Sequence, residues 1–292
     1  MRSKLIILTG ICGAGKTHYA NKYIEQNEEH EKIVRLSSDA IREELYGDES
    51  IQGNPSEVFN IMQSRALEAL DKGCTVLYDA TNMTRKDRAH IISACPPDTH
   101  IACHIVWSPI EICMERDAAR ERTVGKAVID KMLKRFQPPW YDEGINEIRR
   151  IDGADIDICE YTEKYMESMK IDHENPHHTL NIYDHCMRAY DHALGNGYIE
   201  DVVTAAKYHD IGKPYVKDFH NHDGEVTDVA HYYQHQNVSA WISYGLVGCS
   251  IRTAWLIGVH MDPFMDTKYY RQLPKYLKDL VDNLHKADLD AH

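Results

Sequence analysis

The segment GICGAGKT at residues 10–17 constrains the fold more than any other part of the sequence. It matches the pattern G-x-x-x-x-G-K-[ST], follows an apolar run and opens a helical stretch. Glycines in such a loop let backbone N–H groups close around a phosphate, and the helix N-terminus adds positive potential. We expect Lys16 to reach the β- and γ-phosphates of a nucleotide and Thr17 to hold Mg²⁺. The predicted nucleotide-binding residues of the loop are Gly10, Gly13, Ala14, Gly15, Lys16 and Thr17, and the alternative is a glycine-rich turn at a strand–helix junction.

Strand-like and helical segments alternate in the first half of the chain. The β-rich runs are residues 4–9, 32–37, 75–81, 100–107 and 147–151, and helical stretches such as 56–70 and 111–122 lie between them. This alternation predicts an α/β fold of P-loop type, a parallel sheet with flanking helices, over residues 1–153.

From about Asp152 the strand signal fades and helical periodicity takes over. We expect a polar linker at residues 154–171 and an all-α domain at 172–292. Residues 1–150 have a net charge of −2 (21 Lys and Arg, 23 Asp and Glu), whereas residues 151–292 have −11 and hold 13 of the 18 His. Clustered carboxylates and imidazoles suit metal ions, but they do not suit a broad electrostatic contact with nucleic acid, so any such contact should be local and short.

The composition indicates a cytoplasmic protein without membrane segments. No run approaches 18 apolar residues, and the start of the chain leads into a strand and not into a signal sequence. The eight Cys include no C-x-x-C pair, so we expect them to be small buried apolar groups in a reducing compartment.

A base for phosphoryl transfer is predicted just beyond the second β-rich run. Asp39 lies where open α/β sheets place their ligands, and transfer to a hydroxyl requires a group that accepts its proton. Arg42, one turn further, can contact a phosphate of the acceptor. The alternatives are that Asp39 caps the following helix and that Arg42 pairs with Glu43 or Glu44.

Two further groups complete the predicted kinase site. Asp79 ends the third β-rich run and is a candidate for Mg²⁺ or its water shell, with a supporting hydrogen bond as the alternative. Arg116 and Arg120 share a helix face and can close over the donor phosphates as a lid, unless they belong to a solvated face.

These segments resemble the phage-type polynucleotide 5′-kinases over roughly residues 1–150. The similarity lies in the P-loop, SSDAIR at 37–42, DATN at 79–82, ERDAAR at 115–120 and RFQPP at 135–139. It implies that ATP or another NTP with Mg²⁺ is the donor, that Asp39 is the general base, that Arg42 binds the acceptor phosphate, and that Arg116 and Arg120 engage the donor.

Two His-Asp pairs occur in the second half, and their surroundings differ. His209-Asp210 ends an apolar helical stretch, so both side chains can point inward, whereas His222-Asp223 lies among polar residues before Gly224, a turn signal. Only the first pair is placed to coordinate an ion. Further candidate ligands at apolar helical segments are His185, His235, His260 and Asp288, each of which taken alone is more simply a core or surface residue.

The order of these residues resembles the HD-domain phosphohydrolases over roughly residues 172–292. The similarity includes HDIGKP at 209–214, His235 followed by Ser239-Ala240, VHM at 259–261 and AD at 287–288, although Gln236 stands where that family often has Glu. It implies one metal bound by His185, His209, Asp210 and Asp288, and a second bound by Asp210, His235 and His260. Lys213 would contact the substrate phosphate, with an ordinary surface lysine as the alternative, and either His178 or His177 would contact the substrate. The donor set suits divalent Mn, Fe, Co, Ni or Zn.

Together the two resemblances point to bifunctional end-healing enzymes that act on RNA or DNA ends. The kinase would phosphorylate a 5′-OH, and the hydrolase would open a 2′,3′-cyclic phosphate or remove a 3′- or 2′-phosphate, for sealing by a separate ligase. The predicted catalytic residues are Lys16, Asp39, Arg116, Arg120, Asp210 and Lys213. The alternatives are a small-molecule kinase joined to a nucleotidase, and a kinase carrying a degenerate regulatory HD module.

Overall fold

The computed structural model describes residues 3–175 and 179–291, which divide into two compact units. The first unit runs to Ile129 and also includes Pro139–Asp155. The second comprises Asp130–Pro138 and the chain from Ile156 onward. Within the described residues no helix is long and apolar enough to cross a membrane.

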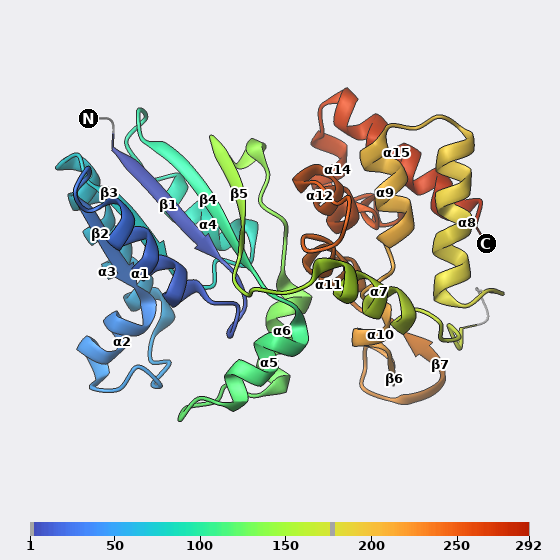
Figure 1. The fold of residues 1–292 in the computed structure, drawn as a ribbon, viewed down its shortest axis with the longest axis horizontal. Helices are drawn as coiled ribbons and strands as arrows, with labels where there is room; N and C mark the ends of the chain where they lie inside the picture. The colour runs from blue at the N-terminus through green and yellow to red at the C-terminus, as the bar shows by residue number, and fades with distance from the viewer. Residues whose placement is uncertain (1–2, 176–178, 292) are drawn as a thin grey trace. The chain divides into compact units, whose positions relative to one another are not determined.

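The first unit is built on a five-stranded sheet in the order β2-β3-β1-β4-β5 (Figure 1). The strands are β1 (Lys4–Thr9), β2 (Ile33–Ser37), β3 (Thr75–Asp79), β4 (His100–Trp107) and β5 (Glu147–Asp152), and every neighbouring pair is parallel. The central strands are buried on both faces, which explains their continuous apolar runs. The predicted parallel sheet with flanking helices, the fold of P-loop kinases, is confirmed.

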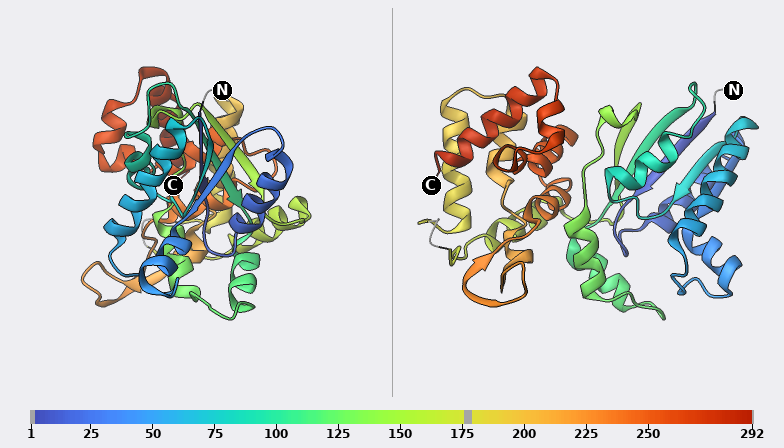
Figure 2. Two further views of the ribbon diagram at one scale, coloured as in Figure 1. Left: turned by 90° about the vertical axis from the view of Figure 1, so that its left-hand side faces the viewer. Right: turned by 180° about the vertical axis from the view of Figure 1, so that it is seen from behind.

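Helices cover both faces of this sheet (Figures 1 and 2). Helix α1 (Lys16–Asn27) packs its Ala20 against Ile6 and Leu8 of β1, and α3 (Pro55–Asp71) and α4 (Arg85–Ile92) lie on the opposite face. The remaining helices of the unit are α2 (Ser38–Tyr46), α5 (Ile110–Ala118) and η1 (Tyr141–Glu143). Neighbouring strands β1 and β3 therefore lead into helices on opposite faces, and their carboxyl ends form the switch point where such sheets bind ligands.

The second unit is mainly helical. Its helices are α7 (Ile158–Ser168), α8 (Ile182–Gly195), α9 (Glu200–Tyr208), α10 (Lys213–Val216), α11 (His235–Ser243), α12 (Ile251–Val259), α13 (Asp262–Met265), α14 (Lys268–Gln272) and α15 (Lys275–Leu289). The stretch expected as a linker, 154–171, contains α7, whose Tyr165 is fully buried. Helix α6 (Lys126–Arg135) begins in the first unit and ends in the second.

The prediction of a purely α-helical second domain was incomplete. An antiparallel hairpin joins β6 (Asp218–His220) to β7 (Val226–His231). The turn between them holds His222-Asp223 and Gly224, whose φ is +81°. An Asp-Gly turn before alternating β-branched residues is a hairpin signal, and the helical pattern on either side obscured it.

Candidate nucleotide site and candidate metal centre

The P-loop connects β1 to α1 with the geometry that its glycines predict. A Cβ at Gly13, where φ is +81°, would lie 2.2 Å from the carbonyl oxygen of Cys113, so α5 packs directly on the loop. Lys16 Nζ donates to the carbonyl oxygens of Gly10, at 2.8 Å, and Ile11, at 3.0 Å. The ammonium is therefore held over the loop at the N-terminus of α1, where phosphate charge is most stabilised.

The two predicted lid arginines differ in position. Arg116 Nη1 donates to the carbonyl oxygen of Gly13 at 3.1 Å and lies 3.4 Å from Ser108 Oγ, which places it against the P-loop. Arg120 follows the end of α5 and is exposed. Asp117 between them is buried and accepts hydrogen bonds from backbone N–H groups at 124 and 125, so it closes the loop that follows Arg120.

The predicted base and its arginine are partners. The hydroxyl of Ser37 accepts from the Ala40 backbone N–H at 3.5 Å and caps α2, so Asp39 is not the cap. The Asp39 side chain is 60% exposed and forms a 2.7 Å ion pair with Arg42, which does not pair with the glutamates that follow it. The carboxylate is therefore oriented by a cation and open to solvent at the carboxyl end of β2.

Asp79 is held by an arginine that sequence reasoning missed. Arg35 of β2 donates through Nε at 3.0 Å and Nη2 at 2.6 Å to the same oxygen of Asp79, and through Nη1 to Asn21 of α1. The carboxylate is 7% exposed. The only sequence signal was a charged residue inside an otherwise apolar strand, and this pairing favours a supporting role for Asp79.

The end of the DATN segment is fixed by buried polar contacts. Asn82, in a left-handed conformation with φ +46°, donates to the Leu8 carbonyl oxygen at 2.8 Å, which ties this loop to β1. Arg88 is fully buried and donates to the Asn82 carbonyl oxygen at 3.1 Å. It also donates to both carboxylate oxygens of Glu143, at 2.7 and 2.8 Å. These contacts set the position of the loop beside the P-loop.

The six metal ligands predicted for the second unit lie together in one buried cluster. Five helices deliver the ligands at their ends or inner faces: His185 from α8, His209 and Asp210 after α9, His235 at the start of α11, His260 after α12, and Asp288 from α15. His177 and His178, the predicted substrate contacts, lie outside the described residues.

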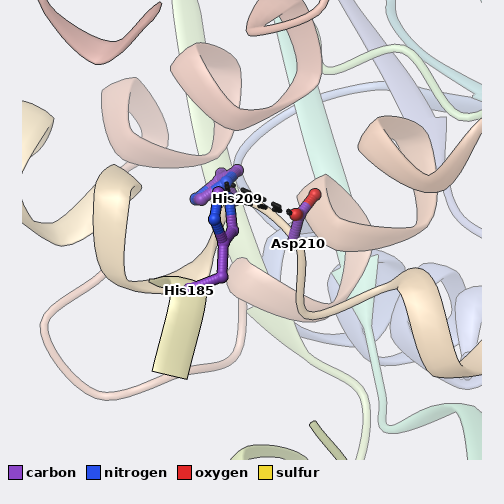
Figure 3. Close-up of side chains that lie close together, drawn as sticks. All are labelled: His185, His209 and Asp210. Carbon is purple, nitrogen blue, oxygen red and sulfur yellow. Dashed lines mark hydrogen bonds and ion pairs between the residues drawn. The ribbon is translucent and has the colours of Figure 1, made fainter. Parts of the chain in front are cut away.

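The carboxylate of Asp210 faces two separate groups of ligands. Its Oδ2 lies 3.4 Å from His209 Nε2 and 3.7 Å from His185 Nε2 (Figure 3). Its Oδ1 lies 3.1 Å from His235 Nε2 and 3.9 Å from His260 Nε2. The ligand atoms within each group lie within 4.8 Å of one another. Asp210 therefore has the position of a bridging ligand.

Asp288 joins the first group. Its Oδ1 lies 3.0 Å from His185 Nε2 and 3.4 Å from His209 Nε2. Burial alone would raise the pKa of Asp288, but the adjacent His209 and His185 hold it well below its ordinary value. The carboxylate is thus ready to bind a cation.

Backbone contacts fix the tautomers of three histidines. The Nδ1 atoms of His209, His235 and His260 lie 2.8, 2.9 and 2.7 Å from the carbonyl oxygens of Ala206, Tyr232 and Ile257. A carbonyl oxygen can only accept, so each Nδ1 carries a proton, and each ring in its neutral form presents its lone pair at Nε2. The Nε2 atoms of His235 and His260 are 3.3 Å apart, so two neutral rings would repel one another here unless a metal ion lies between them, whereas a protonated His235 can donate to His260. The donor set fits a divalent transition metal.

Lys213 supplies the positive charge next to Asp210. Its Nζ lies 2.6 Å from Asp210 Oδ2, and both side chains are under 10% exposed. Burial would raise the pKa of Asp210, but Lys213 and His209 hold it well below its ordinary range. Burial, with the charge of His235, lowers the pKa of His260 to about 3, so its imidazole is neutral near pH 7.

Further residues that hold the cluster were not singled out from the sequence. The Gly212 N–H donates to Ser239 Oγ at 2.9 Å, and a Cβ at Gly212 would lie 2.5 Å from the Ser239 nitrogen, so the turn after Asp210 packs directly on α11. The Tyr232 ring lies 5.3 Å from Lys213 Nζ, and its hydroxyl donates to the His173 carbonyl. The second pair, His222-Asp223, is in the exposed hairpin turn.

Parts of the chain are similar to known proteins. A family model described as an AAA domain matches residues 5–139, less than half of the chain. The transcription factor bHLH140 of Arabidopsis thaliana is 22% identical over 161 residues, which cover 52% of this chain and 16% of that protein. The chain therefore spans about a sixth of that relative.

Several solved structures resemble part of the chain. A Pnkp1/Rnl/Hen1 RNA repair complex contains a chain with 20% identity and a TM-score of 0.41, covering 46% of this chain and 43% of its own. A fungal RNA kinase has 14% identity and a TM-score of 0.40 and covers 59% and 90%. A gluconokinase from Sinorhizobium meliloti has 15% identity and a TM-score of 0.38 and covers 52% and 84%. The family match and the five-stranded sheet agree on a P-loop α/β unit.

Proposed function

We propose that the chain heals nucleic-acid ends with two sites. The first unit would transfer the γ-phosphate of an NTP to a 5′-hydroxyl, and the second would hydrolyse a 2′,3′-cyclic phosphate or a terminal 3′- or 2′-phosphate. The observation that supports the proposed phosphate hydrolysis is that the two carboxylate oxygens of Asp210 face two separate groups of histidines. The polynucleotide substrate rests on the motifs shared with phage-type 5′-kinases.

For phosphoryl transfer, Lys16 and Arg116 would neutralise the donor phosphates, because both lie against the P-loop. Asp39 would accept the proton of the attacking hydroxyl. Its 2.7 Å contact with Arg42 orients the carboxylate and leaves that guanidinium close enough to bind a phosphate of the acceptor. Thr17 would hold Mg²⁺, and Arg120, which follows the end of α5, would engage the donor with Arg116.

For hydrolysis, His185, His209, Asp210 and Asp288 would hold one divalent metal, and Asp210, His235 and His260 a second. Two such ions, of Mn, Fe, Co or Ni, would supply an activated water and charge stabilisation at phosphate oxygens. The chain itself fixes a proton on Nδ1 of the three histidines, which leaves Nε2 as the atom for a metal, and it buries the site from bulk water. Lys213 would leave Asp210 to contact the substrate phosphate. A separate ligase would then seal the healed ends.

A single substrate tests both halves. A short RNA with a 5′-OH and a 2′,3′-cyclic phosphate is incubated with ATP and Mn²⁺, and both ends are followed. Asp39→Asn is expected to abolish 5′-phosphorylation only, and Asp210→Asn to abolish opening of the cyclic phosphate only. The matched controls are Glu43→Gln, an exposed acid on the same helix as Asp39, and Asp223→Asn in the second His-Asp pair.

Other results would point elsewhere. Activity on free nucleosides and nucleotides with none on oligomers would replace this proposal by a small-molecule kinase joined to a nucleotidase, which the −11 charge of the second half suits. Failure to bind divalent metal would reduce the second unit to a non-catalytic module. Equal hydrolysis by the wild type and by Asp210→Asn would refute the assignment of the hydrolytic site to Asp210.

A further inference from the structure

The segment Asp130–Pro138 is part of the unit that carries the metal centre. It begins inside α6 and lies upstream of β5 in the sequence, yet it packs within the second unit. Its contacts fall on α11 and α12. These two helices present His235 and His260, the pair that would hold the second metal.

Phe136 anchors the segment on α11. The side chain is fully buried and meets Trp241 edge-on, with ring centroids 5.3 Å apart and an angle of 89°. It also meets Tyr244 at 5.8 Å and 71°. Such edge-to-face contacts are favoured by the charge distribution of the two rings and fix the orientation of Phe136.

Asn237 connects the segment to the first turn of α11, two residues from the ligand His235. Its Nδ2 donates to the Lys134 carbonyl oxygen at 2.6 Å and to Gln234 Oε1 at 2.8 Å. Gln234 precedes α11 in a left-handed conformation, with φ +64°, and this conformation sets the direction in which the chain enters the helix at His235. The side chain of Asn237 therefore links the segment to the start of α11.

Pro138 packs on α12 just before His260. A Cβ at Gly258 would lie 2.8 Å from Cγ and Cδ of the Pro138 ring, which cannot rotate away. Glycine inside a helix is less stable than alanine, so its presence at this position needs a reason. The close approach of Pro138 accounts for a glycine two residues from a ligand.

We infer that residues 130–138 position the His235–His260 pair, with Asn237 and Gly258 as the receiving residues on α11 and α12. The inference rests on the proposed metal centre. Because His185 and Asp288 are delivered by α8 and α15, loss of this contact acts selectively on the second metal and spares the first. The hydrolase unit is accordingly discontinuous in sequence, and its complete form includes residues that precede β5.

The test compares full-length variants with matched controls. Asn237→Ala removes the contact to Lys134, and Ser243→Ala removes another buried side-chain contact on α11 that stays within the helix. Gly258→Ala places a Cβ against Pro138, whereas Gly195→Ala, at the end of α8, meets nothing within 4 Å. Three quantities are measured for each variant. The number of bound Mn²⁺ per chain is determined after dialysis, and the spin coupling of the ions is determined by EPR. The rate of hydrogen exchange at residues 235–240 is determined in EDTA.

The expected result is a fall from two bound Mn²⁺ to one, with loss of the coupled EPR signal, in Asn237→Ala and Gly258→Ala but in neither control. Exchange at 235–240 is expected to be at least ten times faster in Asn237→Ala. Two coupled ions and unchanged exchange in both variants would overturn the inference. Fewer than two ions in the wild type would refute the proposed metal centre, and the exchange comparison would still decide whether the segment orders α11.

Discussion

Replacement of Lys213 by Met tests the charge balance of the metal centre. The substitution keeps the apolar stem of Lys213 and removes an ammonium that lies 2.6 Å from Asp210 Oδ2, with the two side chains 8% and 2% exposed. Removing one partner of a buried ion pair costs about 3–5 kcal/mol. Because His209 and His235 also lie near this carboxylate, we expect about 3 kcal/mol in metal-free protein.

For a unit of this size, about 3 kcal/mol lowers the melting temperature by roughly 6–12 °C. Two divalent ions would neutralise Asp210 in place of the ammonium, so the loss should shrink when Mn²⁺ is bound. Differential scanning calorimetry in EDTA and in excess Mn²⁺ measures both values. The control is Lys217→Met, a nearby lysine whose ion pair with Glu174 is partly exposed and worth less than about 1 kcal/mol. Equal losses with and without metal, or a loss no larger than that of Lys217→Met, would refute the reasoning.

Three further outcomes follow from the first unit. Arg116→Ala should lower kcat/KM for ATP by about 100-fold, because Arg116 contacts the P-loop. Arg120→Ala should lower it by less, and steady-state kinetics that show the reverse order would contradict this placement. Arg88→Met leaves Glu143 buried without its cation and should lower the free energy of unfolding by about 3–5 kcal/mol in urea titrations, and a loss under about 1 kcal/mol would be inconsistent with it. Burial, with the charge of Lys4, lowers the pKa of His104 from 6.5 to about 4. The unfolded state then binds more protons between these values, so the stability of this unit should fall as the pH drops from 6.5 to 4, and His104→Gln should make that fall shallower in pH-dependent melts; an unchanged slope would count against this origin.

The sequence predicted the elements of the first unit well because each is encoded locally. The apolar runs that form β1, β3 and β4 become buried strands, and the more polar edge strands β2 and β5 were recognised as well. Since parallel strands end at one edge, Asp39 and the P-loop were placed at the same edge without knowledge of strand order. The partner of Asp79 was not predictable in this way, because Arg35 reaches it through lateral pairing of β2 with β3.

The path of residues 130–138 was also beyond local reasoning. The residue spacing around Phe136 does not predict its contacts with Trp241 and Tyr244. These two residues lie about a hundred positions later and contact Phe136 through tertiary packing. The hairpin at 218–231 was missed for a different reason, because its pairing is local. Its turn was recognised at His222-Asp223, but its short strands were obscured by the helical pattern on either side.

The clustering of the candidate metal ligands was predictable from sequence because most of them lie at helix ends. The last carbonyls of a helix lack backbone partners, and a histidine at or just past that end can donate Nδ1–H to one of them. His209 and His260 both follow a helix and both donate to the carbonyl three residues earlier. That bond satisfies the helix terminus and at the same time turns Nε2 toward Asp210. The local requirement of capping a helix thus selects the tautomer that a metal needs, so the ligands are oriented by the fold itself before any ion binds.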